Sequence, residues 1–164
     1  MAIYLKNSAF IHIPKCGGNW ITNMIIAHVK HHSVTNKKSH ILVAHETPPI
    51  DRPVFCLVRE PAEFANSLFW QRKTATVRRY GYIKWDERYD LEKACKSDDY
   101  HTFLKNVADL KNGIENYYKC WYGKYNNVVI GKMENMCEDF ICFLKDNNEE
   151  FDEDKIRSNA ETFY

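Results

Sequence analysis

One short segment, AFIHIPKCGGNW at residues 9–20, places the tightest constraint on how this chain folds. Its first five residues are mostly apolar and predict a buried strand, and the residues from Asn19 onward predict a helix. Between the two lie Lys15, Gly17 and Gly18. Glycines let backbone N–H groups turn inward, a helix N-terminus adds positive potential, and the lysine supplies a full charge. The segment therefore predicts a P-loop-like loop that binds phosphate.

The rest of the chain alternates between strand and helix patterns. The uninterrupted apolar run Val54–Val58 is typical of a strand that is buried on both faces of a parallel sheet. We expect one α/β domain over residues 1–164, a three-layer sandwich around a central and mostly parallel sheet. The expected strands are 9–13, 41–44, 54–58 and 128–130, the expected helices are 19–30, 61–73, 98–110, 114–122 and 135–145, residues 74–97 are expected to be rich in loops, and 146–154 to form a solvated acidic tail.

Composition narrows the class of protein. Lys and Arg number 23 against 22 Asp and Glu, so the net charge is +1, whereas a nucleic-acid-binding surface is strongly basic. The start of the chain, Met1–Ser8, is short and polar, and no apolar run reaches the ~20 residues of a membrane span. The six cysteines form no CxxC pair. We therefore expect a cytoplasmic protein with reduced cysteines that binds neither nucleic acid nor membrane.

Two common phosphate-binding loops do not fit the first segment. The nucleoside-triphosphate loop reads GxxxxGK[ST], whereas here the lysine precedes the glycines. A cysteine phosphatase loop requires an arginine six residues after the cysteine, but the residue six positions after Cys16 is Thr22.

A second strand-to-helix segment carries the chemistry of another phosphate site. It reads VFCLVREPAEFANSLFW and holds Arg59 and Ser67. An arginine at the end of a strand presents a forked cation to a phosphate. A serine two helical turns later can direct its hydroxyl to the same group. Together the two segments predict a ligand with two phosphate groups.

The order Pro-Lys-x-Gly-x-x-Trp resembles the loop of sulfotransferases that use 3′-phosphoadenosine-5′-phosphosulfate (PAPS). Cytosolic members carry a PKSGTTW-like loop, and carbohydrate members carry HIPKTGG. Arg59, Pro61 and Ser67 match the segment of that family that binds the 3′-phosphate. His45 matches the histidine of a KTHLP-like segment, and Glu134 matches the glutamate of a YEDL segment. The resemblance spans residues 10–143, and no RKG segment is found in the sequence.

The resemblance implies a PAPS-dependent sulfotransferase that needs no metal and releases 3′-phosphoadenosine-5′-phosphate (PAP). The acceptor is a hydroxyl or amine of a small molecule or carbohydrate. Lys15 is expected to stabilise the leaving nucleotide and His45 to act as the general base. Trp20 is expected to stack on adenine, and Arg59 and Ser67 to hold the 3′-phosphate. The implied nucleotide-binding residues are Lys15, Cys16, Gly17, Gly18, Asn19, Trp20, Arg59 and Ser67.

Other interpretations of these residues stay open. Trp20 also fits a core position on its helix, and His40 and Glu46 are rivals of His45 for the role of base. Four basic residues are candidates to replace the missing RKG segment. The same four residues also fit a solvated surface of the protein. At the level of function, the alternatives are a non-catalytic module that binds a 3′,5′-bisphosphate nucleotide and a P-loop kinase of a small metabolite. The four candidate substitutes are Arg72, Lys73, Arg78 and Arg79.

Overall fold

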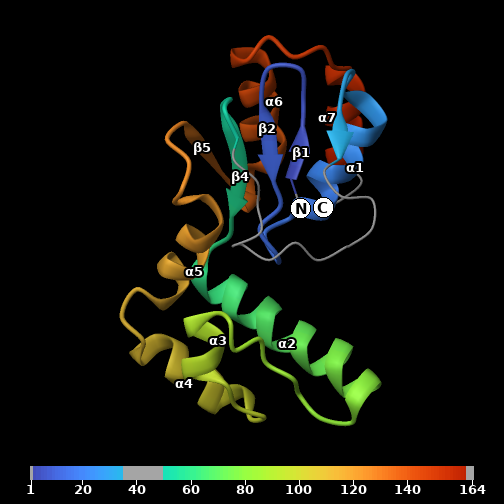
Figure 1. Cartoon of the computed structure of the whole chain (residues 1–164). Coiled ribbons are helices and arrows are strands. Elements are labelled where there is room, and N and C mark those ends of the chain that lie inside the picture. Colours follow the sequence, from blue (N-terminus) through green and yellow to red (C-terminus); the bar gives the residue numbers. More distant parts are fainter. Residues whose placement is uncertain (1, 35–49, 162–164) are drawn as a thin grey trace. The chain divides into compact units, whose positions relative to one another are not determined.

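The computed structural model describes residues 2–34 and 50–161, and the chain forms two compact units (Figure 1). Unit 1 combines Met1–Arg59 with Trp121–Tyr164, and unit 2 is the continuous stretch Glu60–Cys120. Each unit is described by itself below. The strand expected at residues 41–44 lies outside the described residues.

Among the described residues, five strands form one open sheet in the order β3-β1-β2-β4-β5 (Figure 1). Strands β2, β4 and β5 run parallel, as the sequence predicts, whereas β1 pairs with β2 and β3 in antiparallel fashion. The register joins Ile11 to Cys56 and Val58 to Lys132, so the carboxyl ends of β2, β4 and β5 meet at one edge. The strands are β1 (Ala2–Tyr4), β2 (Ala9–Ile11), β3 (Ser33–Val34), β4 (Val54–Val58) and β5 (Val128–Lys132).

The core of unit 1 lies between this sheet and helix α6. The ring of Phe55 on β4 packs against Phe140 at 5.7 Å and against Phe143 at 5.0 Å between centroids. Gly131 on β5 allows this packing, because a Cβ there would lie 2.7 Å from the Phe55 ring. The helices of unit 1 are α1 (Gly18–His28), α6 (Met136–Asp146) and α7 (Glu153–Glu161), with the short 3₁₀ helix η2 (Met133–Asn135) before α6.

The sequence expectation for the end of the chain is wrong in one respect, because the segment 146–154 is not entirely solvated. Glu149 is only 7% exposed. Its Oε1 accepts hydrogen bonds from the backbone N–H of Asn7 at 2.9 Å and from Ser8 Oγ at 2.7 Å. These contacts join the turn between β1 and β2 to the segment that leads into α7.

Helix α2 in unit 2 is longer than the sequence pattern predicts. It runs from Pro61 to Tyr80, whereas the expected helix ended at Lys73. Glu60 caps its start by accepting a hydrogen bond from the N–H of Glu63, and Gly81 ends it in the left-handed region with φ of 80°. The other helices here are α3 (Asp90–Cys95), α4 (Tyr100–Asp109) and α5 (Gly113–Tyr122), of which α3 lies within the stretch expected to be loop.

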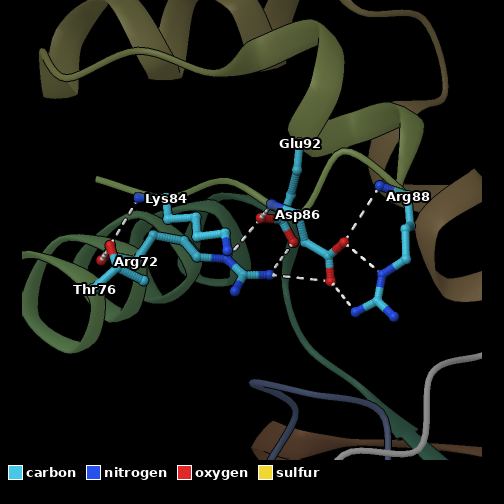
Figure 2. A network of polar contacts seen from close by, with 6 residues as sticks. All are labelled: Arg72, Thr76, Lys84, Asp86, Arg88 and Glu92. Carbon is cyan, nitrogen blue, oxygen red and sulfur yellow. Dashed lines mark hydrogen bonds and ion pairs between the residues drawn. The ribbon is translucent and has the colours of Figure 1, made fainter. Parts of the chain in front are cut away.

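A buried ion pair holds α2 to α3 (Figure 2). Glu92 has no exposed surface and accepts hydrogen bonds from Arg72 Nε at 2.6 Å and Arg72 Nη2 at 2.5 Å. Asp86 donates its backbone N–H to Glu92 and accepts three hydrogen bonds from Arg88, two from the guanidinium and one from the backbone N–H. Burial opposes a charged Arg72, but its hydrogen bonds with Glu92 prevail and raise its pKa. The network is therefore a structural feature of unit 2.

Candidate functional site

The backbone of the loop between β2 and α1 adopts an uncommon conformation. Lys15 has φ of 68° and Gly17 has φ of 75°, so two residues of the turn are left-handed. Lysine rarely adopts this conformation, and strained residues of this kind cluster at functional sites. Helix α1 begins at Gly18 with no capping side chain and no acidic residue in its first turn. Its first N–H groups and their positive potential are therefore not taken up by a side chain.

Gly17 is required at its position for two reasons. Its positive φ disfavours any side chain, and an added Cβ would lie 3.3 Å from Met133 Cγ and 3.3 Å from Met136 Sδ. The loop thus packs tightly against the residues that begin α6. This contact holds the backbone of the turn against Met133 and Met136. Lys15, in the same turn, is half-buried.

Two cations come together where β2 and β4 end. Lys15 follows β2 by four residues and Arg59 follows β4 directly, and the two strands are parallel neighbours. Burial lowers the pKa of Lys15, and the positive charge of Arg59 lowers it further. Both positive charges attract an anion, so a negatively charged group bound near Lys15 and Arg59 would be stabilised by both.

The remaining residues of the loop differ in their exposure. Cys16 and Gly18 are buried, whereas Asn19 is exposed on the first turn of α1. Trp20 is only 4% exposed, and its buried Nε1 has no hydrogen-bond partner among the described residues. The structure therefore places Trp20 in the core, where its ring presents no open face to a ligand.

The structure does not place two of the predicted residues relative to this cluster. Ser67 lies in the second turn of α2 and belongs to unit 2, so its action together with Arg59 stays a prediction. His45 lies outside the described residues, as do its rivals His40 and Glu46.

The structure adds two residues that sequence reasoning missed. His12 lies one residue beyond β2, and its ring packs against Gly18 at the start of α1. Lys132 is exposed at the end of β5, in register with Val58, so each of the three parallel strands ends near a cation. The position of Lys132, two residues after the expected strand 128–130, is a signal that could have identified it. No local signal distinguishes His12.

Arg72 is not available as a substitute for the RKG segment, because its guanidinium is bound to Glu92 (Figure 2). Two other members of that cluster, Lys73 and Arg79, contact aromatic rings. Lys73 Nζ lies 5.1 Å from the centroid of the Trp70 ring, and the Arg79 guanidinium lies 5.3 Å from the Tyr80 ring. These contacts are typical cation–π pairs on the surface of a helix.

Comparisons of the chain with protein-family models, with curated proteins and with solved structures give no significant match. Of the helices in residues 2–34 and 50–161, none has the length and the apolar content that a membrane crossing requires.

Proposed function

We propose that the chain is a PAPS-dependent sulfotransferase whose loop at residues 14–20 binds the 5′-phosphosulfate end of the donor. One observation carries the proposal, namely that Lys15 and Arg59 converge beside the uncapped start of α1. The resemblance to sulfotransferases is what indicates the 5′-phosphosulfate of PAPS as the anion for this cluster of positive charge. The fold that belongs to the proposal is a three-layer sandwich with a P-loop-like phosphate-binding loop.

The residues proposed to donate hydrogen bonds fit part of a ligand that carries two phosphate groups. Lys15 and the backbone of Cys16–Asn19 suit one anionic group, and the guanidinium of Arg59 suits the other. The expected part of Ser67, which lies in unit 2, stays a prediction. The expected contact of Trp20 with adenine stays a prediction, and the burial of its ring does not favour it.

In the proposed reaction, an acceptor oxygen or nitrogen attacks the sulfur atom in line, and the bond to the bridging oxygen of the nucleotide breaks. PAPS supplies the activated sulfuryl group. Lys15 stabilises the negative charge that develops on the bridging oxygen, and the loop N–H groups orient the 5′-phosphate. His45 accepts the proton of the acceptor group. The acceptor is a small molecule or carbohydrate.

The first prediction concerns nucleotide binding, measured by isothermal titration calorimetry with PAP. We expect Lys15→Ala and Arg59→Ala each to weaken PAP binding about 10-fold or more, because each removes a charge-assisted hydrogen bond worth roughly 1.5–3 kcal/mol. Lys111→Ala serves as the control, since Lys111 is exposed in the turn after α4. Wild-type protein that shows no heat of binding with PAP at millimolar concentration would contradict the proposal.

Turnover separates the proposal from its two alternatives. Radiolabelled PAPS with a panel of hydroxyl and amine acceptors is expected to yield a labelled product, and His45→Ala to bind PAP but lose turnover. Binding of PAP with no product on any acceptor would support the non-catalytic nucleotide-binding module. Magnesium-dependent consumption of ATP would support the kinase.

A further inference from the structure

His12 occupies an unusual place for a titratable side chain. It follows β2 by one residue, and its ring stacks on that of Phe10 with the centroids 6.3 Å apart and the planes at 30°. The proposed reaction assigns no step to this residue. Among the described residues, neither ring nitrogen has a hydrogen-bond partner. The ring is only partly buried and its nitrogens are not among the buried polar atoms without a partner, so they stay accessible to water or to a bound ligand.

The ring fills the space that a side chain at Gly18 would occupy. A Cβ built on Gly18 would lie 2.1 Å from His12 Cδ2 and 2.5 Å from His12 Nε2. In a helix, each Cα–Cβ bond tilts toward the N-terminus. Because Gly18 is the first residue of α1, the Nε2 edge of the ring lies on the N-terminal side of the first helical turn. That is the side where the first N–H groups of the helix lie, of which the N–H of Trp20 donates to the carbonyl oxygen of Gly17.

The imidazole is neutral at physiological pH. Burial lowers the pKa of His12 to about 4, and the positive charge of Lys15 contributes to the decrease. A neutral imidazole has one N–H donor and one acceptor nitrogen. It can therefore donate a hydrogen bond to a phosphate oxygen without adding another full charge beside Lys15 and Arg59.

We infer that His12 is a positioning residue of the phosphate loop: its ring sets the start of α1 against β2, and its Nε2–H donates a hydrogen bond to the bound anion. This inference rests on the proposed function, because that function places the 5′-phosphate at this loop. The alternative is a ring that only fills space, which needs no nitrogen and responds to no ligand.

The test is an NMR titration of ¹⁵N-histidine-labelled full chain between pH 7.5 and about 3, with and without saturating PAP, so that the range includes the His12 pKa of about 4. A bound phosphate favours the imidazolium form, so we expect the pKa of His12 to rise by about one unit or more when PAP binds. Exposed His101, in α4 of unit 2, serves as the reference in the same sample. Binding of PAP with an unchanged His12 titration would overturn the inference and leave the proposed function standing.

A variant separates the role of the nitrogens from that of the ring. His12→Phe keeps an aromatic ring against Phe10 and Gly18 but removes both nitrogens. We expect this variant to keep its thermal unfolding temperature and to bind PAP about 5-fold more weakly, which corresponds to one hydrogen bond of about 1 kcal/mol. Affinity for PAP equal to that of the wild type would show that the ring only fills space. His101→Phe is the matched control.

A parallel titration with inorganic sulfate distinguishes a failure of the proposed nucleotide function from a failure of the inference about His12. If PAP does not bind but sulfate raises the pKa of His12, the nucleotide function fails and the role of His12 in anion binding stands. If neither PAP nor sulfate moves the His12 titration, the inference fails together with the anion site.

Discussion

At the scale of single residues, the burial of His12 affects stability as well as binding. Its pKa is about 4 in the folded chain and about 6.5 when unfolded. Between these two values the unfolded state binds more protons than the folded state, so the free energy of unfolding rises with pH. The loss in the free energy of unfolding that His12 causes is absent above about pH 6.5 and grows to roughly 3 kcal/mol as the pH falls toward 4.

We therefore predict that His12→Gln flattens the pH dependence of stability between pH 6.5 and about 4. The measurement is urea unfolding in buffers free of phosphate and sulfate, because a bound anion would raise the pKa of the wild-type ring. Carboxylate titrations contribute equally to both proteins and cancel in the difference. His101→Gln, at an exposed position, is expected to follow the wild-type curve, and a parallel curve for His12→Gln would disprove the account.

The loop shows how far single residues could be predicted. The left-handed turn follows from Gly17, and the convergence of Lys15 with Arg59 follows from two parallel strands that end in cations. The role of Trp20 could not be assigned from the sequence, because a tryptophan on the first turn of a helix is compatible both with a ligand contact and with a core position. Its burial depends on the packing of the whole of unit 1, which no local pattern specifies.

At the scale of elements, the end of α2 is determined by Gly81 rather than by the hydrophobic pattern. The pattern fades after Lys73, which is why the predicted helix was too short. The helix continues because residues 74–80 are compatible with it, and it stops where a glycine can adopt φ of 80°. Gly81, eight residues after Lys73, was the signal for the end of the helix that the amphipathic spacing obscured.

Gly81→Ala is expected to destabilise the protein by about 1 kcal/mol, because alanine is strained in the left-handed region. The space around the position is open, since nothing lies within 4 Å of an added Cβ, so a clash cannot contribute. Gly81→Asn is the matched control and should cost less, because asparagine tolerates this conformation. Urea unfolding measures both, and equal losses for the two variants would mean that backbone strain is not the cause.

At the scale of the whole molecule, unit 1 is assembled from two distant parts of the sequence. The carboxylate of Glu149 reaches Asn7 and Ser8, which lie 142 and 141 residues earlier. Neither the antiparallel strand β1 nor the burial of Glu149 was predictable, because β1 is short and the partners of Glu149 are far away in the sequence. An acidic residue in an acidic stretch is typical of a solvated tail.

We predict that Glu149→Ala destabilises unit 1 by about 1–3 kcal/mol, because it leaves a buried hydroxyl and a backbone N–H without an acceptor. The neighbouring Glu150 provides a matched control, since it forms only exposed ion pairs with Lys6 and Lys30. Glu150→Ala should change stability little. Thermal unfolding of both variants tests the prediction, which fails if the two lose stability equally.

The division of the chain has a consequence for how it is made. Unit 2 is continuous in the sequence, whereas the edge strand β5 of unit 1 and the helix that covers its core come from residues after 120. Domains generally fold as units while synthesis proceeds from the N-terminus. On the ribosome, the β2–α1 loop is therefore translated early but cannot be held by Met133 and Met136 until the last part of the chain emerges. The anion binding that we propose for this loop should accordingly appear only after nearly the full length has been synthesised.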